Sequence, residues 1–89
     1  MRAVITVIGK DRVGIIAGIS TILAECNVNI LDLTQTIMQD IFTMMMLVDV
    51  SKCSISFSDL SDRLDSKGRD LELSVKIQHE DIFSSMHRI

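Results

Sequence analysis

The chain lacks proline, tryptophan and tyrosine, and phenylalanine occurs only three times in its 89 residues. So few aromatic rings argue against RNA recognition on a sheet face, which depends on bases stacking on aromatic side chains. The chain has nine scattered basic residues and twelve acidic ones, which gives a net charge of −3. No stripe of positive charge exists to neutralise several phosphates, so we expect no nucleic-acid partner.

Long apolar runs and paired cysteines are also missing. No apolar stretch reaches the roughly 18 residues that a membrane-spanning helix needs, so no membrane association is expected. Lys10, Asp11 and Arg12 interrupt the first apolar stretch, which excludes the layout of a signal peptide. Cys26 and Cys53 form no CxxC motif and are typical of reduced thiols. We therefore expect one cytoplasmic domain over residues 1–89, with a core at about 3–78 and a tail at 79–89.

Apolar periodicity predicts six regular elements before this tail. The predicted strands are residues 2–8, 28–38, 41–50 and 71–78, with a tight turn at Gln39–Asp40. Asp11 is expected to cap the first helix, and Asn27 is expected to end it. A capping box at 56–59 begins a second helix that is expected to stop near Gly68, and the tail is expected to be helical.

This β-α-β-β-α-β order predicts an α+β, ferredoxin-like two-layer sandwich: a four-stranded antiparallel sheet with two helices on one face. The third strand is expected to point Phe42, Met44, Met46, Val48 and Val50 at the helices. Its other side carries Thr43, Met45, Leu47 and Asp49. The second strand alternates Leu31, Leu33 and Ile37 against Ile30, Asp32, Thr34 and Thr36. Both faces are then partly apolar, which favours a homodimer or higher homo-oligomer; the alternative is a tail folded over the patch.

The segment Gly9–Lys10–Asp11–Arg12–Val13–Gly14 joins the first strand to the first helix. Backbone N–H groups at a helix start form an anion site, and Gly14 allows close approach. The Arg12 guanidinium can donate two hydrogen bonds to a carboxylate, and the Asp11 carboxylate can accept from an ammonium. The Asn29 amide can donate or accept. These groups match the charged ends of a free amino acid. The alternative is structural: Asp11 as a helix cap, Gly14 as a packing residue and Arg12 as a solvated charge.

The pattern Gly9–x–Asp11–Arg12–x–Gly14–Ile15–Ile16–Ala17, with the later Asn27–Val28–Asn29–Ile30, resembles the ACT domain. Val13 stands where many ACT domains have proline, which leaves the loop less stiff. The tail from Gln78 to Ile89 resembles that of free-standing bacterial ACT proteins of uncharacterised function. Those proteins are similar to regulators of glycine-cleavage gene expression, although the regulators carry two such domains.

The resemblance implies a non-catalytic regulatory module that binds a small ligand, an amino acid by expectation, between two copies. Carried over, the ligand-binding residues are Asp11, Arg12, Val13, Gly14, Ile15 and Asn29. No catalytic residue, cofactor or metal is implied, and a regulatory protein partner is possible. The identity of the ligand does not follow from the resemblance.

Two alternatives stay open. The first is a ligand-free protein–protein interaction module that uses the same sheet face. The second is an acylphosphatase-like hydrolase, which Arg12 and Asn29 loosely mimic, although a glycine-rich phosphate loop is missing and Asp11 would repel a phosphate. His79 and His87 are eight residues apart, a spacing that does not place them on one turn, so they are expected to be surface residues and not metal ligands.

Overall fold

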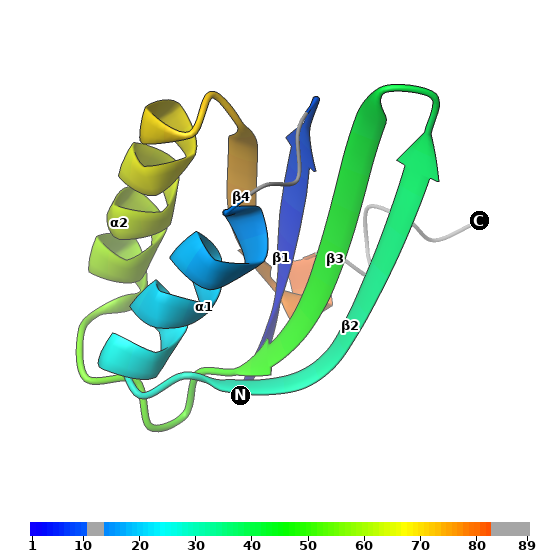
Figure 1. Ribbon diagram of the computed structural model, residues 1–89. Helices are drawn as coiled ribbons and strands as arrows, with labels where there is room; N and C mark the ends of the chain where they lie inside the picture. Colours follow the sequence, from blue (N-terminus) through cyan, green and yellow to red (C-terminus); the bar gives the residue numbers. More distant parts are fainter. Residues whose placement is uncertain (11–13, 83–89) are drawn as a thin grey trace.

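A computed structural model describes residues 1–10 and 14–82 (Figure 1). The elements are β1 (Arg2–Gly9), α1 (Ile15–Glu25), β2 (Asn29–Met38), β3 (Ile41–Asp49), α2 (Phe57–Asp70) and β4 (Ser74–His79). The strands form one antiparallel sheet in the order β2-β3-β1-β4. Both helices cover the same face of this sheet (Figure 1). The predicted ferredoxin-like sandwich is confirmed, and a helical turn begins at Glu80.

α1 ends where the sequence predicts, because Asn27 adopts the left-handed conformation with φ 60°. Its N–H donates to the Ala24 carbonyl at 3.2 Å, and the Val28 N–H donates to the Leu23 carbonyl at 2.8 Å. This pair of bonds is the Schellman motif, which satisfies carbonyls that a helix end leaves without partners. The motif turns the chain directly into β2.

α2 begins as predicted and ends later than predicted. Ser56 is its N-cap, and the Ser56 Oγ accepts from the Asp59 N–H at 3.1 Å. The helix ends at Asp70, two residues beyond Gly68, and the left-handed residue after it is Glu72, with φ 58°. The Leu73 N–H then donates to the Gly68 carbonyl at 2.7 Å, so the turn occupies the first residues expected in the last strand, and β4 begins at Ser74.

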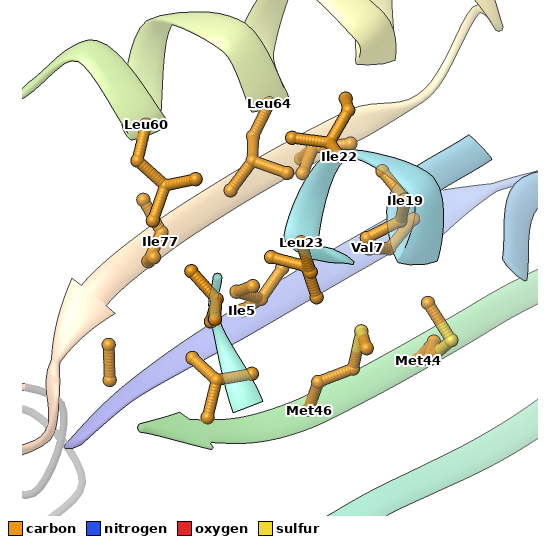
Figure 2. Packing of buried hydrophobic residues seen from close by; sticks show 14 of the residues in the cluster. Ile5, Val7, Ile19, Ile22, Leu23, Met44, Met46, Leu60, Leu64 and Ile77 are labelled. Atoms are coloured by element: carbon orange, nitrogen blue, oxygen red, sulfur yellow. The ribbon is translucent and has the colours of Figure 1, made fainter. Parts of the chain in front are cut away.

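The core lies between the helices and the sheet (Figure 2). The five side chains of the third predicted strand that were expected to face the helices are confirmed to lie in this core, and each is at most 7% exposed. They are Phe42, Met44, Met46, Val48 and Val50. They pack with apolar residues of β1, both helices and β4, namely Ile5, Val7, Ile19, Leu23, Leu60, Leu64, Val75 and Ile77. Cys26 is also in this core, as a free thiol. Burying each large side chain contributes roughly 1.5–3 kcal/mol, so this layer dominates the stability of the domain.

β2 contains a bulge that the sequence pattern does not reveal. Ile30 pairs with Val48, but Asp32 pairs with Leu47, so Leu31 is the extra residue. The expectation that Ile30 shares a face with Asp32 was therefore wrong. Ile30 faces the helix side together with Leu33 and Ile37, because one inserted residue reverses the alternation beyond it.

Apolar surface gathers along β2 more than on the open sheet face. On that face Met45 and Leu47 are half-buried and Val4 is only 8% exposed. By contrast, the exposed large apolar side chains of β2 and the adjacent hairpin end are Ile30, Leu31, Ile37, Met38 and Ile41, between 38% and 68% exposed. The part of the chain available to dock another surface is thus an edge strand. Within residues 1–10 and 14–82, no helix is long and apolar enough to span a membrane.

Candidate functional site

Gly14 is the N-cap residue of α1, with φ 77°. Its carbonyl accepts the Gly18 N–H at 2.9 Å, and a Cβ built on it would meet no atom within 4 Å. Asp11, Arg12 and Val13 lie outside the described residues, as does the expected Asp11 cap. Ile15 is 1% exposed, so its side chain belongs to the core and its backbone N–H is what a ligand could reach.

Asn29 lies at the other end of α1 from Gly14. The helix has 11 residues, which at 1.5 Å per residue is about 16 Å of length. The sheet register agrees, since Gly9 pairs with Phe42 at one end of β3, while Asn29 pairs with Asp49 at the other. One copy of the chain therefore does not bring Gly14 and Asn29 to one ligand.

Asn29 borders a hollow of about 400 Å³ at the base of the sheet. Its lining residues come from the end of α1, the start of β2 and the end of β3, and they are Ala24, Asn27, Val28, Asn29, Asp49 and Lys52. The Asn27 Nδ2 donates to the Lys52 carbonyl at 2.9 Å, which ties the turn after β3 to the end of α1. The hollow thus combines an amide, a carboxylate and an ammonium.

The Asp49 carboxylate is the most engaged group in this hollow. Its Oδ1 accepts from the Ser51 N–H at 2.9 Å and from the Ser51 Oγ, and it lies 3.6 Å from the Met1 ammonium. These hydrogen bonds from Ser51 lower the pKa of the Asp49 carboxyl from its ordinary value of 3.8. Asp49 therefore carries its negative charge throughout the neutral range.

Sequence reasoning missed Asp49 and Lys52, and the bulge explains the first omission. In a regular hairpin with its turn at Gln39–Asp40, Met38 pairs with Ile41, and each step back along β2 is matched by one step forward along β3. That register would set Asn29 opposite Val50. The bulge shifts this register by one residue and places Asp49 there. Lys52 follows β3 in a turn, where no periodicity marks its neighbours.

A second hollow, of about 670 Å³, separates α1 from α2. Gly14 and Gly18 line it on one side, and Arg63 and Lys67 line it on the other. The Arg63 guanidinium donates to Glu25 at 2.7 Å and to the Cys26 Sγ at 3.0 Å, and these contacts raise the Arg63 pKa. Arg63 is thus already paired across the helices.

The two histidines weighed as metal ligands are His79 and His87. His79 stacks on Phe57, with ring centroids 4.0 Å apart and planes at 16°, while His87 lies outside the described residues. Within residues 1–10 and 14–82, no group of three His, Cys, Asp or Glu side chains is placed to hold a metal ion. The acylphosphatase-like alternative requires the loop and Asn29 to act in one site. Gly14, the described residue at the end of the loop, lies at the opposite end of α1 from Asn29, which argues against this alternative.

Comparison with known proteins agrees with this fold. A family model of the ACT domain matches residues 2–78, so the chain belongs to the ACT domain family. A UPF0237 protein from Clostridium acetobutylicum is 60% identical over 89 residues and is matched over 100% of both chains. The structure of an ACT domain protein from Streptococcus pneumoniae matches with a TM-score of 0.81, 41% identity and 93% coverage of each chain.

A more distant match has the same fold. The structure of a protein assigned as a glycine cleavage system transcriptional repressor matches with a TM-score of 0.71 and 24% identity. The match covers 86% of this chain and 44% of that one. ACT domain proteins are generally non-catalytic regulatory modules, and this chain shares their architecture.

Proposed function

We propose that this protein is a non-catalytic regulatory module that binds a small amino acid between two copies of the chain. One observation carries the proposal: Gly14 and Asn29 lie at opposite ends of α1. A site that uses both the loop and Asn29 must therefore combine the loop of one copy with the Asn29 of another.

The edge strand β2 supports this arrangement. Among the described strands it pairs only with β3, and it is exposed along its length except at Leu33. An exposed apolar edge is a template for pairing with another strand. If two β2 strands pair antiparallel about a two-fold axis, Asn29 of one copy comes opposite the hairpin end of the other, which is the end of the sheet that carries Gly9 and Gly14.

The ligand class follows from the groups at the two ends. Arg12 in the loop can bind a carboxylate, Asp11 can accept from an ammonium, and Asn29 can donate and accept. The α1 N-terminus adds backbone N–H groups that favour an anion. A free amino acid carries both charges, and binding it would link its concentration to the assembly of two copies.

A thermal-shift screen against the twenty amino acids tests this function. An amino acid present at a hundred times its dissociation constant adds about 2.7 kcal/mol to the stability of the folded state, which raises the melting temperature. Arg12→Ala and Asn29→Ala should abolish the shift, whereas Lys76→Ala, an exposed change on β4 at the other edge of the sheet, should retain it. If no amino acid shifts the melting temperature, the sensing function is wrong.

The second candidate is a ligand-free interaction module, which the exposed apolar residues of β2 favour by themselves. Sedimentation with Ile37→Lys tests the edge, since a charge at this exposed position should separate the two copies. Ser74→Lys, an exposed change on the opposite edge strand β4, is the matched control and should leave assembly unchanged. A wild-type protein that is monomeric and insensitive to amino acids, yet captures another protein through β2, would establish this alternative.

A further inference from the structure

The hollow beside Asn29 contains a complete pair of opposite charges that the family resemblance does not assign. Asp49 is placed there by its pairing with Asn29 across β2 and β3, and Lys52 by the turn that follows. Both backbones are fixed: the Asn27 Nδ2 holds the Lys52 carbonyl, and the Cys53 N–H donates to the Val50 carbonyl at 3.1 Å. The two charged side chains therefore border the same hollow from a rigid frame.

The carboxylate of Asp49 keeps capacity for a further donor. Its side chain is 41% exposed, and the contacts with Ser51 and with the Met1 ammonium are all made to Oδ1. A carboxylate has about four lone-pair sites, so Oδ2 can accept from an ammonium without displacing Ser51.

Lys52 can bind the negatively charged group of a ligand. It is exposed, and in the part of the chain that the structure describes no carboxylate forms an ion pair with it. Its ammonium offers three donors on a flexible stem that can reach a ligand carboxylate over the hollow.

We propose that this hollow reads both charges of a free α-amino acid, with Asp49 accepting from its ammonium, Lys52 pairing with its carboxylate and Asn29 bonding to either. The inference rests on the proposed function, in which Arg12 and Asp11 of the other copy's loop pair with the same carboxylate and ammonium, and it adds Asp49 and Lys52 on the Asn29 side of the seam. Charged and amide groups in this combination select a zwitterion over a simple amine or acid, because either analogue leaves one charged group without its partner.

The rest of the lining selects the side chain of the ligand. Ala24 and Val28 are apolar, and Asp49 and Lys52 are both used by the backbone charges. A volume of about 400 Å³ lies within the range of small-molecule sites and holds a free amino acid. Because the lining leaves no further charged group for the side chain of the ligand, the hollow favours an amino acid with a neutral side chain, such as glycine, alanine or serine.

Calorimetric titration tests this inference with the three probes L-alanine, ethylamine and propionate. Wild-type protein should bind alanine and neither analogue. Lys52→Met and Asp49→Asn should each weaken alanine binding at least tenfold, whereas Lys76→Met and Asp62→Asn, exposed changes elsewhere, should leave it unchanged.

Ser51→Ala separates recognition from structure, since it removes the Ser51 hydroxyl bond but keeps the Asp49 charge. It should bind alanine as the wild type does, and circular dichroism should confirm that every variant is folded. If glycine, alanine and serine bind the wild type and both Lys52→Met and Asp49→Asn with equal affinity, this inference is wrong while the proposed function stands. If none of the twenty amino acids binds the wild type, both fail together.

Discussion

Gly14 and Asn29 lie at opposite ends of α1, joined by a helix of 11 residues and about 16 Å. The sheet fixes this separation independently, because Gly9 and Asn29 align with opposite ends of β3. Two residues that are close to the same helix in sequence are thus unable to share a ligand within one copy. A ligand site that uses both residues therefore requires two copies of the chain, and dimers formed from two different variants can test this requirement.

Mixed dimers of Arg12→Ala and Asn29→Ala should regain binding that each variant lacks alone. In such a dimer one site combines the intact loop of one chain with the intact Asn29 of the other. Refolding the two variants together at equal amounts should restore about a quarter of the wild-type number of sites, because half of the dimers are mixed and each has one intact site. Calorimetric stoichiometry with the amino acid found in the screen measures this fraction.

Failure of this complementation has a definite meaning. If the mixture binds no more ligand than its separate components, although sedimentation shows mixed dimers, then the loop and Asn29 do not form a shared site across two copies.

Gly68→Ala should destabilise the fold by about 1–3 kcal/mol, although alanine is the better helix former. The new Cβ would lie 2.9 Å from the Val75 Cγ2 and 3.0 Å from the Leu73 carbonyl oxygen, and a backbone atom of the turn cannot easily move. Gly18→Ala is the matched control, since its Cβ would meet only the ends of the Lys67 and Leu71 side chains, at 3.0 and 3.3 Å. Urea unfolding at one protein concentration should show Gly18→Ala neutral or stabilising by up to about 1 kcal/mol; equal losses at the two glycines would contradict the packing described.

Gly14→Ala should cost about 1–2 kcal/mol through its backbone alone. The residue has φ 77°, and a Cβ there would meet nothing within 4 Å, so sterics with neighbours add nothing. Gly14→Asn should cost less, because asparagine tolerates the left-handed region better than other residues with side chains. Unfolding free energies from urea titration give both values, and an alanine variant as stable as the asparagine variant would contradict this conformation.

Ser56→Ala should destabilise the protein by about 0.5–2 kcal/mol, because it leaves the Asp59 N–H without the acceptor at the start of α2. Ser58→Ala lies two residues further on, in the exposed first turn of the same helix. It removes a hydroxyl without removing the cap, and it should be neutral or slightly stabilising. Thermal unfolding of the pair isolates the cap; similar losses in the two variants would mean that Ser56 does not act as the N-cap.

The Asp49 carboxyl should titrate below 3.8, because hydrogen bonds from Ser51 lower its pKa. The folded-state pKa then lies below the unfolded value, so the contribution of Asp49 to stability is present above pH 3.8 and is lost as pH falls through the folded pKa. Carboxyl chemical shifts from NMR give the midpoint. Ser51→Ala should raise it toward 3.8, and an unchanged midpoint in that variant would contradict the assigned cause.

Most of the fold follows from patterns that are local in sequence. The alternation in β3 predicted which five side chains enter the core, and both a left-handed Asn27 and a capping Ser56 were predicted from residue type. The end of α2 did not follow, because Gly68 is a glycine for a different reason: it makes room for Val75. A glycine needed for close packing and one needed for a left-handed turn look the same in a sequence.

The candidate site also has some features that follow from local sequence and others that depend on the tertiary structure. The sequence by itself determined the loop with Gly14, the presence of Asn29 and the family to which both belong, since these depend on residues next to each other in the chain. Only the tertiary structure decided that Asp49 stands beside Asn29. The reason is the bulge at Leu31, because one extra residue in β2 changes every cross-strand neighbour beyond it and leaves no mark on local periodicity.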